Sequence, residues 1–250
     1  MLTQETDFVF ERGARNNRVS IIIPLYNYAH HVVETLDSVL AQSTDDISLI
    51  VVDDCSTDNS VDTVRQWMQR QRRRRMGMVL VRNRANARLS ITRNTGIALS
   101  RSDYCFMLDA DNILYPRCIE KHVEALAARP DADAAYSLLE VFEGQADVIG
   151  AGVFTRDGLR HGNFIDAMAL FRRSMLLAMD GYENIRYGWE DYDLWLRMVQ
   201  EDRIALHLPE ILARYRQHNS SMLRTETNIN QNIHFLHDFM KKRHDWLELR

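Results

Sequence analysis

The sequence alternates short apolar runs with helical patterns through its first half, and few folds accommodate that alternation. Four apolar runs lie at 19–27, 47–54, 77–83 and 103–111. Segments with helical spacing or helix-start residues separate them, at 30–42, 59–73 and 89–100. Because each run is apolar at successive positions, both faces of the sheet must be covered. The pattern predicts an α/β fold whose mainly parallel sheet is flanked by helices, with Pro24 stopping the first strand.

The second half is less regular but continues to mix strands and helices. We expect helices at 116–129, 189–200 and 226–247, a strand at 134–143, a loop or hairpin at 144–163, a strand and short helix within 164–182, and strands at 203–208 and 211–216. The last helix is amphipathic, with a stripe of Ile229, Ile233, Leu236 and Met240. We expect it to pack on the domain or on a dimer partner.

Composition narrows the class of protein. Asp and Glu number 35 against 31 Lys and Arg, and this acidic balance argues against a general nucleic-acid binder. Three scattered cysteines indicate reduced thiols in a cytoplasmic protein rather than a disulfide framework. No apolar run approaches the length of a membrane span. The basic run at 70–76 predicts a solvated face, or at most a peripheral contact with the inner membrane surface.

Polar clusters follow three of the predicted strands, in the segments PLYN, DDCS and DADN. Ligands of parallel sheets bind at the carboxyl ends of the strands, so we expect these clusters to converge on one crevice. On a strand, Asp109 and Asp111 would point the same way about 7 Å apart. Such a pair suits a divalent cation, although Asp109 as a helix cap or as the partner of an arginine is the alternative.

Common nucleotide-binding fingerprints are absent from the sequence, which has neither GxGxxG after the first strand nor a GK[ST] phosphate loop. The phosphates of a nucleotide therefore need another counter-charge. Mn²⁺ or Mg²⁺ on Asp109 and Asp111 would supply it and would relieve the repulsion between the two carboxylates.

Six segments in order resemble the family 2 glycosyltransferases, which have the GT-A fold: VSIIIPLYN, LIVVDDCSTD, RNTGIALS, YCFMLDADN, WEDYDLWLR and RYRQHNSSM. The resemblance covers residues 18–222. It implies a single domain over 1–250, with a nucleotide-sugar half at 18–112, an acceptor half at 113–222 and a C-terminal helix within 223–250. It also implies an inverting transfer of a sugar from a nucleotide-diphosphate donor, with UDP favoured over dTDP or GDP.

The resemblance places several residues around the nucleotide. Pro24 and Tyr26 match the segment that flanks the nucleoside, where Tyr26 would stack on the base; a packed core aromatic is the alternative. Asp54 matches the acceptor of a base imide, and Asp53 lies nearer the ribose. The family usually has glycine where Cys55 stands. Arg93 and Asn94 match the segment that faces the nucleotide.

The same resemblance assigns the metal and the base. Asp111 matches the metal-ligating acid, Asp109 the acid nearer the sugar and ribose, and His218 a histidine that completes the metal site in part of the family. Asp191 matches the general base that takes the proton of the acceptor hydroxyl. Glu190 and Asp193 are competing carboxylates for that role.

The acceptor side is less defined. Trp189 would line the acceptor pocket, with a core tryptophan as the alternative, and Asn163 lies in a stretch that borders the donor sugar. Glu190 is a further candidate contact. The expected acceptor is a glycan or a lipid-linked glycan. Two other classes remain open, a sugar-phosphate nucleotidyltransferase and a non-catalytic sugar-nucleotide or glycan-binding module.

Overall fold

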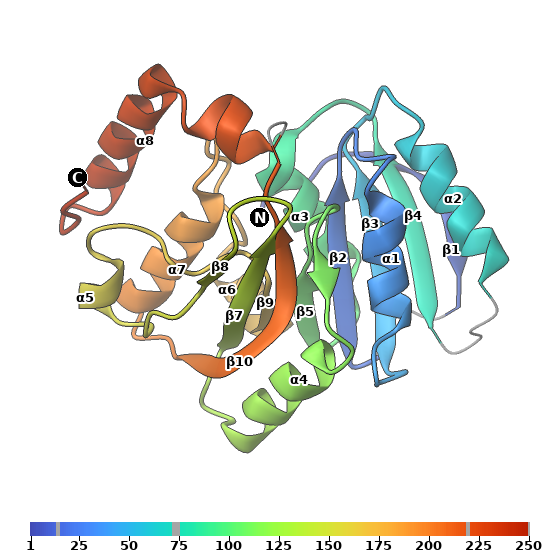
Figure 1. Ribbon diagram of the computed structural model, residues 1–250, viewed down its shortest axis with the longest axis horizontal. Coiled ribbons are helices and arrows are strands. Elements are labelled where there is room, and N and C mark those ends of the chain that lie inside the picture. Colours follow the sequence, from blue (N-terminus) through green and yellow to red (C-terminus); the bar gives the residue numbers. More distant parts are fainter. Residues whose placement is uncertain (14–15, 72–75, 219–220, 250) are drawn as a thin grey trace.

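The computed structural model describes residues 1–13, 16–71, 76–218 and 221–249, and in this part of the chain ten strands form one sheet (Figure 1). The strands are β1 Thr6–Arg12, β2 Val19–Leu25, β3 Ile47–Asp53, β4 Gly77–Asn83, β5 Tyr104–Met107, β6 Ile113–Leu114, β7 Ala134–Phe142, β8 Asp147–Ile149, β9 Ala169–Arg172 and β10 Ala205–Arg216. The helices are α1 Val32–Leu40, α2 Ser60–Arg70, α3 Arg88–Leu99, α4 Cys118–Ala128, α5 Arg156–Leu159, α6 Arg173–Ala178, α7 Glu190–Gln200, the π-helix η1 Leu223–Thr227, and α8 Asn230–Arg243. The order of strands across the sheet is β1-β4-β3-β2-β5-β9-β7-β10-β6, with β8 beside β7.

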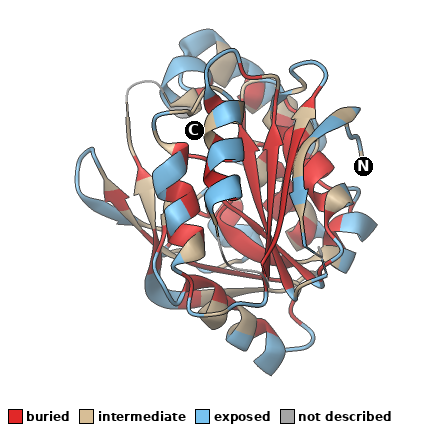
Figure 2. Cartoon of the chain, turned by 90° about the vertical axis from the view of Figure 1, so that its right-hand side faces the viewer, coloured by how far each residue is buried: buried red, intermediate tan, exposed pale blue. Residues whose placement is uncertain are grey.

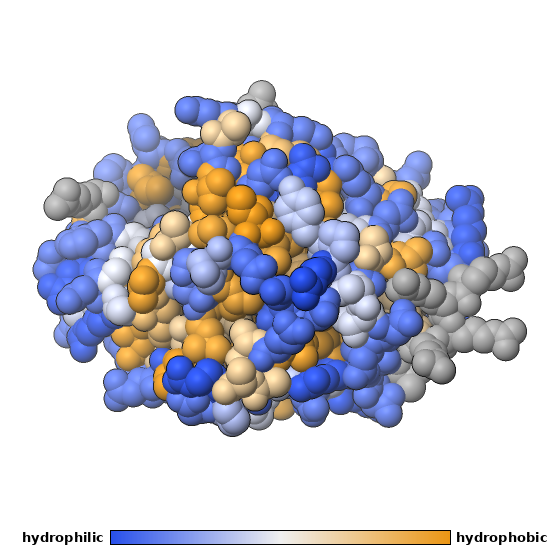
Figure 3. All heavy atoms as spheres, turned by 60° about the horizontal axis from the view of Figure 1, so that its bottom comes forward, coloured by the Kyte–Doolittle hydropathy of each residue, from blue (hydrophilic) through white to orange (hydrophobic). Residues whose placement is uncertain are grey.

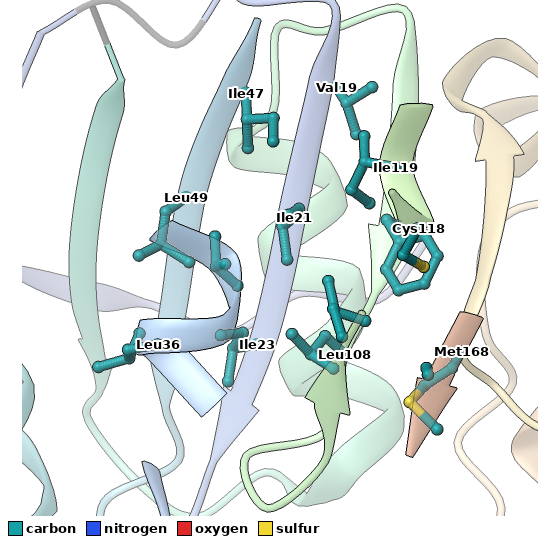
Figure 4. Close-up of a cluster of buried hydrophobic side chains, with 14 of the residues drawn as sticks. Val19, Ile21, Ile23, Leu36, Ile47, Leu49, Leu108, Cys118, Ile119 and Met168 are labelled. Atoms are coloured by element: carbon teal, nitrogen blue, oxygen red, sulfur yellow. The ribbon is translucent and has the colours of Figure 1, made fainter. Parts of the chain in front are cut away.

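The four apolar runs form the parallel core of the sheet, in the order β4-β3-β2-β5, as the sequence predicts. Successive residues of β2 enter opposite cores: Ile21 and Ile23 lie in one with α1, and Ile22 lies in the other with α3. Figure 4 shows Ile21 and Ile23 beside Leu36 of α1. Figure 2 shows the consequence, a buried sheet with helices exposed on their outer faces. The expectation of an α/β fold is confirmed.

The second half extends this sheet through an antiparallel strand. β9 pairs antiparallel with both β5 and β7, and β7 pairs parallel with β10. The two strands expected at 203–208 and 211–216 are a single strand, β10. A register shift between Leu208 and Ile211 allows it to continue past Pro209, since the shifted residues need no regular ladder bond there. The passage at 144–163 contains the hairpin strand β8 and the short helix α5.

Pro24 does not stop the first strand, because β2 continues to Leu25. Asp54 donates its backbone N–H to the carbonyl of Leu25, whereas the carbonyl of Ile22 accepts from Leu108 beside β5. Neighbouring residues of a strand face opposite partners, so the nitrogen of Pro24 faces the β5 side. The ladder with β5 ends at Ile22, and no ladder bond is therefore lost at Pro24.

The two ends of the chain depart most from expectation. The sequence analysis missed β1, an edge strand that pairs antiparallel with β4 and is only partly buried. The C-terminal helix is shorter than predicted, and of its expected stripe Leu236 and Met240 are buried, whereas Ile229 lies before the helix and is exposed.

The expected peripheral contact with a membrane stays a prediction. None of the helices in the described ranges is both long and apolar enough to cross a membrane. Residues 72–75 of the basic run lie outside the described residues. Figure 3 shows one face of the molecule, on which apolar side chains form patches among hydrophilic ones. Apolar patches of this kind are common on folded proteins and identify no partner.

The contact between α3 and β2 gives a test of the packing. A Cβ at Gly96 would lie 2.3 Å from Cγ2 of Ile22, and both residues are buried. We expect Gly96→Ala to push α3 off the sheet and to lower the free energy of unfolding by about 1–3 kcal/mol, measured by urea denaturation. The control Ala98→Ser, on the exposed side of the same helix, should change it by less than about 0.5 kcal/mol. Equal stability of Gly96→Ala and the unmodified chain would contradict this close approach.

Candidate active site

The turns after β2 and β3 are bonded to each other and form one side of the candidate site. The backbone N–H of Asn27 donates to the hydroxyl of Ser56 (3.0 Å), and the side-chain oxygen of Asn27 accepts from the N–H of Thr57 (2.8 Å). Cys55, the residue directly before Ser56, has a φ of 64°. This left-handed conformation accounts for the glycine that the family usually has here, since glycine adopts it without steric cost.

Two acids at the end of β3, Asp53 as its last residue and Asp54 directly after it, brace these turns. The carboxylate of Asp54 accepts from the side-chain nitrogen of Asn83 (2.7 Å) and from the N–H groups of Ala87 and Arg88 (both 2.8 Å). Asp53 accepts from the N–H of Ser56 (3.0 Å), and its side chain has no exposed surface. Asp53 is thus enclosed by the chain's own groups. Its expected place near the ribose and the expected contact of Asp54 with a base stay predictions.

Tyr26 and Asn94 differ in how they are placed. Tyr26 is 46% exposed, which excludes the core alternative and leaves its ring accessible for stacking on a base. Pro24, two residues earlier, is buried inside β2. Asn94 is buried, and its side-chain amide pairs at both ends with the backbone of Tyr182 (2.8 Å each). Asn94 thus ties α3 to the segment before α7, and its expected contact with the nucleotide stays a prediction.

Arg93 lies at the centre of the site, buried between two acids from distant parts of the chain. Its guanidinium donates to Asp109 (2.7 Å), after β5, and to Glu190 (2.5 Å), the first residue of α7. Burial alone would lower the pKa of Arg93, but Asp109 and Glu190 raise it above its ordinary value, so the guanidinium stays charged. The expected contact of Arg93 with phosphate or ribose remains a prediction.

The acids of the DADN segment do not lie on a strand. β5 ends at Met107, and Asp109 begins a turn in which its carbonyl accepts from the N–H of Asn112 (3.2 Å). The two carboxylates consequently have separate partners: Asp109 meets Arg93, whereas Asp111 lies 2.9 Å from Nε2 of His218. Burial, followed by the charge of Asp109, raises the pKa of Asp111. The expectation of two parallel carboxylates on one strand is wrong, although their segment is at the site.

Asp111 and His218 are the residues most suited to hold a divalent cation. Oδ2 of Asp111 and Nε2 of His218 lie 2.9 Å apart, within hydrogen-bond distance. Among the described residues, no group of three His, Cys, Asp or Glu side chains is placed to hold a metal. A cation here would need further ligands from water and substrate phosphate, which is how Mg²⁺ is commonly bound, and Mn²⁺ accepts imidazole as well. The donor set fits such a substrate-completed site.

Asp191 lies near a second group of acids. Its carboxylate accepts from the side-chain nitrogen of Asn163 (3.0 Å), so the structure joins these two predicted residues. Burial, then the charges of Glu190 and Asp166, raise the pKa of Asp191 well above the usual carboxyl range. Trp189, just before α7, is partly exposed and lies beside His237 of α8, with ring centroids 5.4 Å apart.

Asp166 is a member of this site that the sequence analysis missed. Its carboxylate accepts from the N–H of Met168 (2.8 Å), and it interacts electrostatically with Asp109, Asp111, Asp191 and Arg93. Burial and the charge of Asp109 raise its pKa. The stretch that contains Asn163 was singled out, but a lone aspartate in it carries no motif or spacing that would identify it.

Comparison with known proteins bears on the family and the fold of the chain. The family model described as "Glycosyl transferase family 2" matches residues 20–177. The Bacillus subtilis protein EpsE, which bears the name of a glycosyltransferase, is 28% identical over 214 residues, covering 83% of this chain and 76% of that protein.

Two solved structures share the fold. TarS 1–349 of S. aureus, in complex with UDP-GlcNAc, superposes with a TM-score of 0.70 at 16% identity, over 83% of this chain and 61% of that one. The mannosyltransferase PcManGT of Pyrobaculum calidifontis, with GDP-Man and Mn²⁺, has a TM-score of 0.65 at 20% identity, over 80% of this chain and 57% of that one. The chain thus spans about three fifths of these two solved chains.

The crowded acids give the stability of the protein a predictable pH dependence. The folded chain holds protons on Asp191 and Asp166 that the unfolded chain releases near pH 4. Stability contributed in this way is present at low pH and falls as pH rises from about 4 through the raised pKa values. Asp191→Asn removes one of these acids, so its melting temperature should exceed that of the unmodified chain above pH 7, by a margin that grows as the pH approaches the raised pKa of Asp191, about 8, and is constant beyond it.

Thermal unfolding in EDTA between pH 5 and 9 measures this effect. Asp245→Asn is the control, because Asp245 is exposed and should give a curve parallel to that of the unmodified chain. A melting temperature for Asp191→Asn that stays below that of the unmodified chain at every pH would contradict the crowding.

Proposed function

Because this chain belongs to the glycosyl transferase family 2, we propose that it transfers a sugar, with inversion, from a nucleotide-diphosphate donor to an acceptor hydroxyl, using Asp191 as general base. The donor class is supported by two proteins of the same fold, TarS and PcManGT, which were solved with UDP-GlcNAc and with GDP-Man. We favour a UDP-sugar for this chain. The proposed acceptor is a glycan or a lipid-linked glycan.

The assignment of the base depends on how the three acids of the segment WEDYD are paired. Glu190 is held by Arg93 (2.5 Å). Asp193 is fully buried and accepts from Arg197, Arg243 and His244. Among the described residues, Asp191 has the neutral Asn163 as its side-chain partner and no arginine or histidine pair within salt-bridge distance. It is thus the acid of the three that remains available to accept a proton.

The environment of Asp191 also suits that role. A general base works best when its pKa lies near the operating pH, and burial together with Glu190 and Asp166 moves the pKa of Asp191 upward in that direction. Asn163 donates to one oxygen of the carboxylate (3.0 Å) and the backbone N–H of Tyr192 donates to the other (2.7 Å). Both oxygens are thereby oriented, and each keeps a lone pair for the acceptor hydroxyl. Attack by that hydroxyl on the anomeric carbon in a single displacement would invert its configuration.

The donor would lie along the strand ends. The exposed ring of Tyr26 is the proposed stacking surface for the base, and Asp54 the proposed acceptor of its imide N–H. Asp111 and His218 would hold Mn²⁺ or Mg²⁺, which when bound stabilises the negative charge of the departing diphosphate. Arg93 would act mainly by keeping Asp109 and Glu190 in place.

Release of nucleoside diphosphate tests the proposed reaction. The chain is incubated with UDP-GlcNAc or GDP-mannose and Mn²⁺, and the UDP or GDP released by slow transfer to water is measured. We expect Asp191→Asn to lower this rate at least 100-fold, the range typical of a lost general base, while calorimetry shows unchanged UDP affinity. The exposed Asp238→Asn is the control.

Other outcomes separate the alternatives. Near-normal release by Asp191→Asn would show that the base is another residue. Binding without release from either donor would favour a non-catalytic sugar-nucleotide-binding module, and release of pyrophosphate from UTP with a sugar phosphate would favour a nucleotidyltransferase.

The metal assignment has its own test. Asp111→Ala removes one of the two proposed protein ligands, so we expect the affinity for UDP in the presence of Mn²⁺ to fall by about tenfold or more. Calorimetry in EDTA should give equal, weak affinities for this variant and the unmodified chain. Asp245→Ala at an exposed position serves as the control. An unchanged Mn²⁺-dependent affinity for Asp111→Ala would remove Asp111 from the metal site.

A further inference from the structure

The backbone immediately before Asp191 is held in an unusual conformation. Tyr187, Gly188 and Trp189 have φ angles of 76°, 110° and 65°, three consecutive residues in the left-handed region. Two of them carry side chains, for which this conformation is costly. Such strain persists only where surrounding contacts fix the backbone. The next two residues are Glu190 and Asp191, so whatever fixes this turn also fixes the proposed base.

The segment that holds the turn comes from the C-terminal part of the chain. The hydroxyl of Thr227, at the end of η1, donates to the carbonyl of Tyr187 (2.7 Å). Thr227 is buried, and a Cβ at Gly188 would lie 2.9 Å from its hydroxyl oxygen. On the same side, the ring of Trp189 lies against that of His237 in α8. The turn is thus packed directly against η1 and α8.

A second attachment lies two residues beyond Asp191. The carboxylate of Asp193, which has no exposed surface, accepts from Nε of Arg243 (2.6 Å) and from Nε2 of His244 (3.0 Å), both at the end of α8. It also accepts from Arg197 within α7 (2.7 Å). The C-terminal segment therefore bonds to the chain on both sides of Asp191. Thr227 bonds to Tyr187, before Asp191, whereas Arg243 and His244 bond to Asp193, after it.

We propose that Thr227 is a positioning residue for the reaction: its hydroxyl fixes the left-handed turn 187–189 and so sets where the carboxylate of Asp191 lies between Asn163 and Glu190. This inference rests on the proposed role of Asp191 as base. Thr227 acts through the backbone of Tyr187 and does not itself touch substrate. The C-terminal segment is thereby a working part of the site, even though α8 carries none of the residues assigned to donor or metal.

Three variants isolate the hydroxyl. Thr227→Val keeps the shape and removes the donor, Thr227→Ser keeps the donor, and Thr225→Val is the matched control. Thr225 lies in the same π-helix, and its exposed hydroxyl bonds to Ser221 (3.0 Å) within that segment. We expect Thr227→Val to lower kcat for UDP release about tenfold with the KM for UDP-GlcNAc within twofold, and Thr227→Ser to retain at least half of the activity.

The pH profile distinguishes positioning from a loss of folded protein. Displacing Asp191 from Glu190, Asp166 and Asn163 should move the acid limb of the kcat profile of Thr227→Val to lower pH, whereas a smaller folded fraction would scale the profile without moving it. An unmoved limb together with equal loss in Thr227→Ser would overturn the positioning role.

Hydrogen exchange gives a readout that needs no turnover. In Thr227→Val, the amides of 187–192 should exchange at least tenfold faster than in the unmodified chain, with no such change in Thr225→Val. Unchanged exchange there would overturn the proposal. If Asp191→Asn retains full activity while exchange in Thr227→Val is accelerated, the base assignment fails but the hold of Thr227 on the turn stands.

Discussion

A single buried guanidinium connects the turn after β5 to the start of α7, and the arrangement of the acids around it depends on this connection. Arg93, 2% exposed, reaches from α3 to Asp109 after β5 and to Glu190 at the start of α7. A buried charge is tolerated only when its partners are in place. The ion pair with Glu190 therefore ties α7, which lies between β9 and β10 in the chain, to α3 and the parallel first half of the sheet. Because Asp191 follows Glu190 directly, Arg93 also constrains the proposed base.

Negative charges outnumber positive charges around Arg93. Asp109, Asp111, Asp166, Glu190 and Asp191 are five carboxylates that interact around one guanidinium. A diphosphate donor would add further negative charge, and Arg93 is already paired with two of the acids. Neutralisation has to come from elsewhere, and the structure offers two separate places for it. Asp111 and His218 would supply ligands for a cation, and burial raises the pKa values of Asp166 and Asp191, which disfavours ionisation of all the crowded acids at once.

The sequence predicts the parallel half of this fold well because its strands are apolar on both faces and its helices intervene at regular spacing. Three of its strands are found within two residues of their expected bounds, and β5 is shorter by ending at Met107, before the acids. The partly exposed edge strand β1 lacks that apolar signal and was missed. The prediction that Pro24 stops the first strand was wrong, because the effect of a missing N–H depends on which neighbouring strand it faces. That is a property of the assembled sheet. Asp166 and Thr227 were missed for the same reason: each acquires its role from segments distant in the chain.

The three acids of WEDYD illustrate what a motif leaves undecided. Residues 190, 191 and 193 project from α7 in different directions, since each step along a helix turns the side chain by about 100°. Glu190 meets Arg93, Asp193 meets Arg243 and His244, and Asp191 meets Asn163. In the sequence alone, all three are carboxylic acids, and their chemistry does not distinguish the base from the other two. What separates them is the element that packs against each face of the helix, and for Asp193 that element is α8, the part of the chain whose sequence carries no catalytic signal. The acid that we propose as the base is thus the one that the surrounding fold leaves without an arginine or histidine partner among the described residues.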